Sequence, residues 1–304
     1  MVGVSTGIPF SKGHGTGNDF VVLSDPEGDL DLSPELIRAL CDRRFGVGGD
    51  GVLRVVRTGR AAAAPELDVT APVGAPEWFM DYRNSDGTVG ETCGNGIRVF
   101  ARFLVERGLA QPGRMEIMTR GGVRVVAADR SGDIAVDMGA PVRRGFPVEA
   151  SIGLGAAVFR AAALGMPNPH AVVLLDSLAG LPEVLPAPAI DAADFPEGAN
   201  VELATILSSE QPISARMRVY ERGSGETLSC GTGACAVGVV VSERLDLPPG
   251  VPILLEVAGG TLSIELTPQG TVRMTGPAEL LADGEVRADW WLAHGGGTLP
   301  ETGR

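Results

Sequence analysis

The most regular pattern along this chain is an alternation of apolar and polar residues, which is typical of strands buried on one face. The alternation occupies four segments bounded by glycine or proline: 121–127, 133–138, 216–220 and 261–266. Two other segments have the spacing of helices. In the first, apolar residues share one helical face (Ile97, Phe100, Ala101 and Leu104), and the second, 234–241, is apolar on nearly all sides. This mixture predicts an α+β protein.

The chain also repeats itself once. Each helical segment follows a Cys-Gly-x-Gly sequence, at 93–96 and 230–233, and each of these follows a segment that begins with tyrosine, at 82–87 and 220–227. Three further pairs of similar segments recur in the same order along the chain. The agreement predicts two halves derived from one ancestral unit.

The repeat determines the expected domain organisation. Residues 1–138 would form the first half, completed by 277–292, and residues 139–276 would form the second half. The last residues, 293–304, are expected to be a loose tail. A stretch rich in alanine, proline and glycine, 59–76, is expected to be a loop insertion.

Composition excludes several classes of function. With 25 Lys and Arg against 38 Asp and Glu, the net charge is −13, so neither nucleic acid nor an anionic membrane is an expected partner. The sequence shows no secretory signal pattern and no apolar run long enough to span a membrane, which predicts a cytoplasmic protein. The four cysteines are then expected to be thiols. The three histidines lack the spacing of a ligand set, so no metal is expected.

Lysine is almost absent. Of the 25 cationic residues only Lys12 is a lysine, so it is the one candidate for a Schiff base with pyridoxal phosphate. The phosphate-binding framework that usually accompanies such a lysine is not found in the sequence. No cofactor is therefore expected.

The duplicated cysteines point to proton transfer. A thiol at a helix N-terminus is made more acidic by the helix dipole and by unpaired backbone N–H groups, so Cys93 and Cys230 are the expected reactive thiols. The same N–H groups would bind a carboxylate, and two such helix ends around one carboxylate would place a sulfur on each face of the adjacent carbon. That geometry suits removal of a proton from one face and its return to the other. A single Cys-Gly-x-Gly would indicate only a turn with a buried thiol.

The motifs resemble those of the diaminopimelate epimerase family, a group of cofactor-independent amino-acid racemases and epimerases. The similar segments are 13–20, 46–51, 84–87, 93–96, 168–170, 195–200, 219–223 and 230–233, and the match extends to about residue 277. The resemblance implies two pseudo-symmetric domains, each a curved mixed or antiparallel sheet wrapped around a central helix. It implies interconversion of L,L- and meso-diaminopimelate without pyridoxal phosphate, in lysine and peptidoglycan precursor synthesis, and it permits a homodimer.

The resemblance also implies roles for individual residues. Cys93 and Cys230 would be acid and base, exchanging roles with the direction of reaction, while His170 and Glu221 help to set their protonation. The substrate would be contacted by Asn18, Asn84, Asn168, Asn200, Glu221 and Arg222, and its reacting α-carboxylate by Gly94, Asn95, Gly231 and Thr232. Without the resemblance, the asparagines indicate turns and Glu221 a surface ion pair with Arg222. His14, Cys41 and Cys235 receive no catalytic role.

Three positions depart from the family pattern: Gly51, Pro167 and Gly198. They bear on substrate details rather than on the reaction class, because none is expected to touch a thiol. The alternatives to be weighed are proline or hydroxyproline racemisation, an isomerase that has lost one cysteine, an amino-acid binding protein, and a metal hydrolase. Retention of both cysteines argues against the second and third of these, and the distal polar residues argue against proline.

Overall fold

The computed structural model describes residues 7–64, 67 and 69–297, and these form two compact units. Unit 1 comprises the chain up to Ile134 together with the residues from Ala278 onward, and unit 2 comprises Ala135–Pro277. The domain boundaries predicted at 138/139 and 276/277 lie within a few residues of these divisions. That the two units descend from one ancestral unit stays a prediction. No helix among the described residues is long and apolar enough to cross a membrane.

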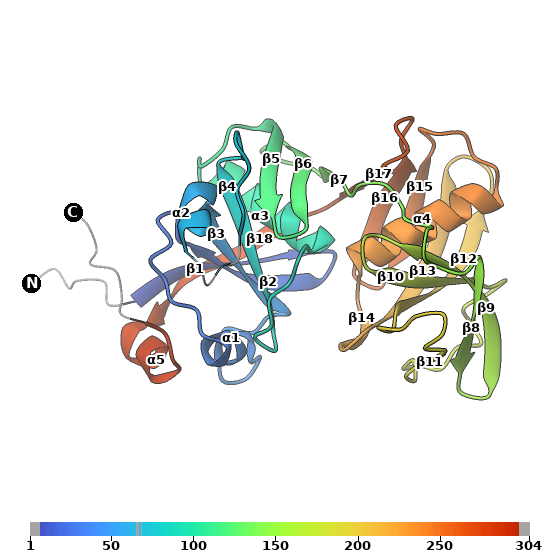
Figure 1. Ribbon diagram of the computed structural model, residues 1–304, viewed down its shortest axis with the longest axis horizontal. Helices are drawn as coiled ribbons and strands as arrows, with labels where there is room; N and C mark the ends of the chain where they lie inside the picture. The colour runs from blue at the N-terminus through green and yellow to red at the C-terminus, as the bar shows by residue number, and fades with distance from the viewer. Residues whose placement is uncertain (1–6, 65–66, 68, 298–304) are drawn as a thin grey trace, which may run out of the picture. The chain divides into compact units, whose positions relative to one another are not determined.

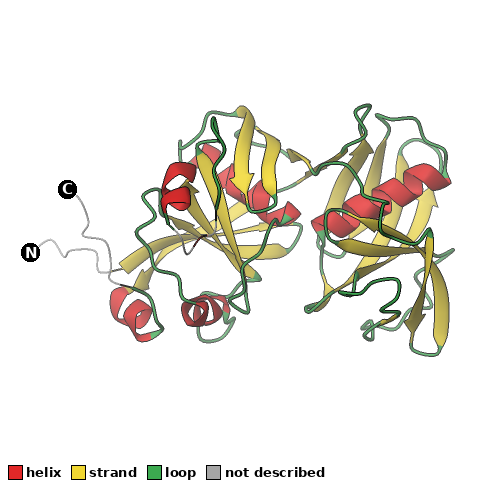
Figure 2. Cartoon of the chain, in the orientation of Figure 1, coloured by secondary structure: helices red, strands yellow, loops and turns green. Residues whose placement is uncertain are grey.

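Unit 1 is a mixed sheet with helices on both faces (Figures 1 and 2). Its strands pair in the order β18, β1, β2, β3, β4, β5, β6, and the β2–β3 and β4–β5 pairs are parallel while the others are antiparallel. The last strand of the chain therefore completes the sheet beside the first. The elements are β1 (Gly7–Gly15), β2 (Asn18–Ser24), α1 (Pro34–Cys41), β3 (Gly51–Arg57), α2 (Thr58–Ala63), β4 (Trp78–Asn84), α3 (Gly94–Glu106), β5 (Gly113–Thr119), β6 (Gly122–Ala128), β18 (Glu279–Arg287) and α5 (Ala288–Ala293).

Unit 2 repeats this pairing. Its strands pair in the order β8, β9, β10, β12, β13, β15, β16. The β10–β12 and β13–β15 pairs are parallel and the other pairs in this order are antiparallel, as in unit 1. The sequence repeat is thus matched by a repeat of sheet topology. The elements are β7 (Ile134–Asp137), β8 (Glu149–Leu154), β9 (Ala157–Gly165), β10 (Pro169–Leu174), β11 (Ala189–Ile190), β12 (Asn200–Ser208), β13 (Ile213–Glu221), β14 (Gly225–Thr227), α4 (Gly231–Arg244), β15 (Pro252–Val257), β16 (Gly260–Leu266) and β17 (Val272–Gly276).

The two long helices are the central helices that the sequence predicts. Helix α3 packs against strands β1, β2, β6 and β18, and α4 packs against β10, β12, β16 and β17. Residues of α4 from Gly231 to Ser242 are all buried, which explains why this segment is apolar on nearly all sides. Figure 1 shows α4 running across the strands of its unit. The α+β fold with a helix inside each sheet is confirmed.

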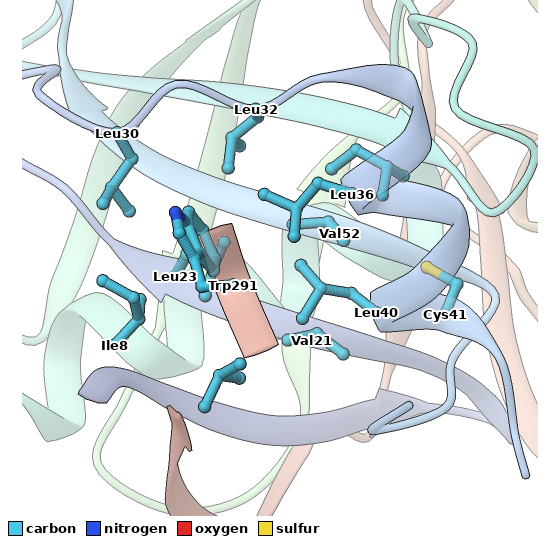
Figure 3. Packing of buried hydrophobic residues seen from close by; sticks show 12 residues of the cluster. Ile8, Val21, Leu23, Leu30, Leu32, Leu36, Leu40, Cys41, Val52 and Trp291 are labelled. Atoms are coloured by element: carbon cyan, nitrogen blue, oxygen red, sulfur yellow. The ribbon is translucent and has the colours of Figure 1, made fainter. Parts of the chain in front are cut away.

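Unit 1 has a second apolar layer on the other face of its sheet (Figure 3). Val21 and Leu23 of β2 contact α1 there, and Trp291 of α5 is completely buried in the same cluster. Because strand side chains alternate between faces, Phe20 and Val22 point to the opposite face, the side of α3. Helices cover both faces, so all four residues are buried and β2 shows no polar alternation.

The four strands predicted from alternation are confirmed as β6, β7, β13 and β16. The loop expected over 59–76 is partly wrong, because its first residues belong to α2 and Leu67 is buried in a cluster with Phe79 and Met118. The burial of Leu67 anchors the segment to the sheet. The expected loose tail lies partly outside the described residues, and within the described part Gly296 pairs with Leu32.

Candidate functional site

Each of the two repeated cysteines caps the central helix of its unit. The Sγ atom of Cys93 accepts a hydrogen bond from the backbone N–H of Gly96, at 3.3 Å, and Sγ of Cys230 accepts one from the N–H of Gly233, at 3.4 Å. Both cysteines have extended backbone conformation, as an N-cap residue requires. The sulfur atoms therefore lie at the positive ends of α3 and α4, where a developing negative charge is favoured.

The second glycine of each Cys-Gly-x-Gly segment lies against a side chain of the sheet. A Cβ atom on Gly233 would lie 2.5 Å from Oε1 of Glu202, and one on Gly96 would lie 3.2 Å from Cδ2 of Leu53. The sheet therefore approaches the first helical turn closely in both units. Leu53 and Glu202 occupy corresponding places in the two units. Leu53 lies two residues after Gly51, the first residue of β3 paired with β2, and Glu202 lies two residues after Asn200, the first residue of β12 paired with β10.

Two asparagines and an aspartate surround Cys93 in unit 1. The thiol of Cys93 donates to Oδ1 of Asn18 across 3.7 Å, and Nδ2 of Asn95 donates to the same oxygen across 3.4 Å. The Nδ2 atom of Asn18 in turn donates to Oδ2 of Asp50 at 2.8 Å. Cys93 is half-buried, whereas Cys230 is buried.

Asn84 lies at the end of β4, where it pairs with Gly51 at the start of β3. Its Nδ2 atom donates to Oγ1 of Thr88 at 2.9 Å. Gly51 is one of the positions that depart from the family pattern. A Cβ atom there would lie 2.5 Å from the carbonyl oxygen of Arg83, so only glycine fits this backbone.

A compact polar cluster surrounds Cys230 in unit 2. Nδ2 of Asn200 donates to Sγ of Cys230 at 3.8 Å, and Oγ1 of Thr232 lies 3.4 Å from the same sulfur. The carboxylate of Glu221 also hydrogen-bonds to Cys230, and it accepts from the hydroxyl of Thr227. Burial and the neighbouring carboxylates of Glu221 and Glu202 raise the pKa of Cys230 well above its ordinary value of 9.0.

Burial also raises the pKa of Glu221 above its ordinary value of 4.5, against the opposing effect of its hydrogen bonds to Thr227 and Cys230. A carboxyl group with a raised pKa beside a buried thiol can accept and release a proton. The two groups are therefore suited to exchange a proton.

His170 lies directly behind this cluster and is completely buried. Its Nδ1 atom is 2.7 Å from Oε1 of Glu202, and its Nε2 atom is 3.1 Å from Oδ1 of Asn168. Glu202 is the functional residue that the sequence did not single out. A signal was present, because it is a lone carboxylate within the apolar run of β12, where a charged side chain requires a partner.

Arg222 is the predicted contact for the distal end of the substrate, and it lies at the surface of unit 2. Its guanidinium donates to the carbonyl oxygen of Glu197 at 2.7 Å, and its stem packs over Gly198. Gly198 has φ of +75°, and an added Cβ atom would lie 3.3 Å from Cδ of Arg222. A side chain at position 198, where the sequence departs from the family pattern, would therefore crowd the stem of Arg222.

A group of charged residues in unit 1 was also missed. Lys12 and Arg43 both form ion pairs with Asp19, and Arg43 pairs in addition with Asp50. Although burial raises the pKa of Asp19, the hydrogen bonds from Arg43 and Lys12 hold it well below its usual range. Lys12 also donates to the carbonyl oxygen of Gly48. The one lysine of the chain thus anchors the segment that carries Asp50.

The predicted residues fall into two groups, one in each unit. In unit 1 hydrogen bonds join Asn18, Cys93 and Asn95, with Gly94 next to Cys93, while Asn84 bonds to Thr88 instead. In unit 2 hydrogen bonds join Cys230 to Asn200, Thr232 and Glu221, Asn200 to Arg222, and His170 to Asn168, with Gly231 next to Cys230. Cys41 and Cys235 lie outside them and are buried, and burial raises the pKa of Cys41 to about 12. Among the described residues, no three His, Cys, Asp or Glu side chains are placed to hold a metal ion.

Comparison with known protein families gives one clear match. A family model described as diaminopimelate epimerase matches residues 10–144 and 162–281. Curated relatives include the diaminopimelate epimerase of Streptomyces coelicolor, 47% identical over 94% of this chain and 98% of that protein. The diaminopimelate epimerase of Thermobifida fusca is 45% identical over 91% of this chain and 97% of that protein.

Solved structures with much lower sequence identity share the fold. A hydroxyproline epimerase from Agrobacterium vitis matches with a TM-score of 0.64 at 14% identity, over 96% of this chain and 95% of that one. A phenazine biosynthesis protein of the PhzF family from Bacillus anthracis matches with a TM-score of 0.61 at 14% identity, over 92% of this chain and 98% of that one. At this identity the similarity concerns the fold alone.

Proposed function

The chain belongs to the diaminopimelate epimerase family, and from this premise we propose that it interconverts L,L- and meso-diaminopimelate, with one of Cys93 and Cys230 removing the α-proton and the other donating a proton in its place. The carrying observation is that both cysteines occupy the same N-cap position in the two units of a family member. An amino-acid binding protein without catalysis would have no use for two such thiols.

In the proposed reaction one cysteine removes the α-proton as a thiolate and the other, as a thiol, donates a proton to the opposite face of the α-carbon. Epimerisation then inverts the carbon, and the two sulfur atoms exchange protonation states. The reverse direction uses the same groups in exchanged roles. Proton transfer from a positioned side chain contributes about 10²- to 10⁴-fold to the rate.

The carbanion requires stabilisation because the α-hydrogen of an amino acid is a very weak acid. The N-termini of α3 and α4 offer backbone N–H groups for the substrate α-carboxylate, at Gly94 and Asn95 in unit 1 and at Gly231 and Thr232 in unit 2. Donors fixed in advance stabilise the negative charge that spreads onto this carboxylate during the reaction.

The remaining predicted residues have proposed roles consistent with their contacts. Glu221 hydrogen-bonds to Cys230 and is the proposed proton partner of that thiol, and His170 supports the same cluster through Asn168. Arg222, with its exposed planar guanidinium, is the proposed partner of a distal carboxylate. Asn18, Asn84 and Asn200 would contact the polar groups of the substrate.

The test is hydrogen exchange in D₂O. Incubation of the protein with L,L-diaminopimelate should place deuterium at one α-carbon as the meso isomer forms, measured by mass spectrometry and chiral chromatography. A panel containing proline, hydroxyproline and other amino acids is the control for specificity. Absence of exchange with diaminopimelate would refute the proposed activity, and exchange with proline alone would move the assignment to proline racemisation.

A further inference from the structure

A chain of four hydrogen bonds runs through the side chains beside Cys93. NH2 of Arg98 donates to Oγ1 of Thr16 at 3.3 Å, and this hydroxyl donates to Oδ1 of Asn95 at 3.3 Å. Nδ2 of Asn95 then donates to Oδ1 of Asn18 at 3.4 Å, and Nδ2 of Asn18 donates to Oδ2 of Asp50 at 2.8 Å. Arg98, Thr16 and Asn95 are at most 1% exposed.

The carboxylate end of this chain fixes the orientation of both amides. A carboxylate can only accept hydrogen bonds, whereas an amide has one donating end and one accepting end. Asp50 therefore faces Nδ2 of Asn18, which leaves Oδ1 of Asn18 to accept from Nδ2 of Asn95 and Oδ1 of Asn95 to accept from Thr16. In that orientation Oδ1 of Asn18 faces Sγ of Cys93, at 3.7 Å.

The asparagine beside Cys230 in unit 2, Asn200, presents the opposite end to its cysteine. Oδ1 of Asn200 accepts from the backbone N–H of Arg222 at 2.9 Å, so its Nδ2 atom is the end that faces Sγ of Cys230, at 3.8 Å. A backbone N–H can only donate, so this orientation is also fixed. Cys93 therefore faces an amide acceptor and Cys230 an amide donor.

We propose that Asp50 is a positioning residue: by accepting from Nδ2 of Asn18 it holds the Asn18 oxygen on Cys93, which favours the protonated thiol of Cys93 in the free protein. A hydrogen bond made by a neutral thiol favours the thiol over the thiolate, and a bond received by the sulfur does the reverse. The bond from Asn200 acts the other way on Cys230, against the burial and the carboxylates that raise the pKa of that thiol. The relevance of the Cys93 proton to catalysis rests on the proposed function, whereas the orientation of Asn18 does not.

Charges around Cys93 must be separated from this effect in any test. Asp50, Asp19, Arg43, Lys12 and Arg98 all lie in the same region of unit 1. Loss of the Asp50 charge would by itself favour the Cys93 thiolate. The charge of Asp50 and its hydrogen bond from Asn18 can be separated with two substitutions. Both remove the charge, and only one of them removes the oxygen that accepts from Asn18.

Asp50→Asn and Asp50→Leu form such a pair. Oδ2 of Asp50 accepts from both Nδ2 of Asn18 and the backbone N–H of Asp19, whereas Oδ1 accepts only from the exposed guanidinium of Arg43. In Asp50→Asn the oxygen should occupy the place of Oδ2, where two donors converge, and Asn18 keeps its orientation. In Asp50→Leu the acceptor is lost and Asn18 can turn its NH₂ group toward Cys93.

The measurement is the pH dependence of iodoacetamide alkylation at Cys93, followed by peptide mass spectrometry on the full chain without substrate. The alkylation midpoint should lie at lower pH in Asp50→Leu than in Asp50→Asn, and the rate at pH 7 should be about three- to tenfold higher, the effect of one hydrogen bond. Cys230 in the other unit should react equally in both variants. Equal Cys93 midpoints in the two variants would overturn the proposal.

A second measurement uses the unmodified protein and so does not depend on whether Asp50→Leu folds. With asparagine labelled by ¹⁵N, the Asn18 NH₂ protons should show nuclear Overhauser contacts to the backbone N–H of Asp19, which donates to the same oxygen. Contacts to the β-protons of Cys93 instead would overturn the proposal. Neither readout involves turnover, so a failure here is distinct from a failure of the epimerase assignment.

Discussion

The Nδ1 atom of His170 lies 2.7 Å from Oε1 of Glu202, and both side chains are completely buried. The places that correspond to them in unit 1 are occupied by Phe20 and Leu53, as the register of the two parallel strand pairs indicates. One copy of the repeat therefore has a polar pair behind its cysteine, and the other copy has two apolar residues.

This difference predicts how the buried pair responds to substitution. Glu202→Ala leaves Nδ1 of His170 without its partner in the protein interior, while Nε2 keeps Asn168, so we expect a loss of about 2 kcal/mol in the free energy of unfolding. The double variant His170→Phe with Glu202→Leu reproduces the unit 1 combination and should be less destabilised than Glu202→Ala alone. Urea denaturation measures both, and the exposed Glu210→Ala is the matched control, with no expected change.

The single variants His170→Phe and Glu202→Leu are measured as well. If the double variant lost as much stability as the sum of these two, the pair would not be exchangeable for apolar residues. The unit 1 combination would then depend on differences in backbone packing between the units. The Oε2 atom of Glu202 bears on this outcome, because it is buried and has no hydrogen-bond partner among the described residues. Its removal should therefore offset part of the loss.

The ionisation of Glu221 should contribute to the pH dependence of the free energy of unfolding. Its pKa is raised by burial, so on a rise in pH above 4.5 the unfolded chain ionises first and the folded protein retains the proton. The free energy of unfolding should therefore fall as the pH rises from 4.5 through the raised pKa. Glu221→Gln removes this contribution.

Urea denaturation of the original chain and of Glu221→Gln at a series of pH values measures the difference. The stability of the original chain relative to Glu221→Gln should decrease toward higher pH. A difference that stays constant across this range would contradict a raised pKa, because then both states would bind the same number of protons.

Several features of the site were predictable from the sequence because they follow from local patterns. The cysteines, the glycines beside them and the two central helices are visible in the repeat, since helical spacing and tight turns leave a signal over a few residues. Glu202 was not found, although a lone carboxylate in an apolar strand was visible. Its partner His170 lies on β10, and the parallel pairing of β10 with β12 cannot be read from either segment alone.

The orientation of Asn18 illustrates a further limit. It depends on Asp50, which lies in another segment of the chain and meets Asn18 only in the folded unit. The sequence placed Asp50 in a motif without giving it a role, because a hydrogen bond between side chains has no periodicity. Hydrogen bonds between side chains of separate segments can be identified only once the fold is known.

The ion pairs of Asp19 should protect unit 1 against acid. Hydrogen bonds from Arg43 and Lys12 lower its pKa despite burial, so their stabilisation is complete above pH 3.8 and is lost as the pH falls toward the lowered pKa. Lys12→Met removes one partner of Asp19 and should cost about 2 kcal/mol at pH 7. The variant should also lose part of the stability difference between pH 7 and pH 2.

Circular dichroism during acid titration and urea denaturation at pH 7 test this expectation. Arg287→Met is a matched control, since it removes an exposed partner of Asp289 that lies on the surface. An unchanged acid transition in Lys12→Met would mean that Arg43 alone holds the Asp19 carboxylate.

The two-base proposal makes its sharpest prediction for the single-cysteine variants. Cys93→Ala and Cys230→Ala should each lose epimerisation by about 10²-fold or more, because each retains only one of the two proton-transfer groups. Each variant should still exchange the α-hydrogen of one isomer with D₂O, since the remaining thiolate can remove a proton from one face and return a deuteron to the same face. The two variants should act on opposite configurations at the reacting carbon. Mass spectrometry of L,L- and meso-diaminopimelate incubated separately with each variant measures this, and exchange of both isomers by one variant would show that its remaining cysteine reaches both faces.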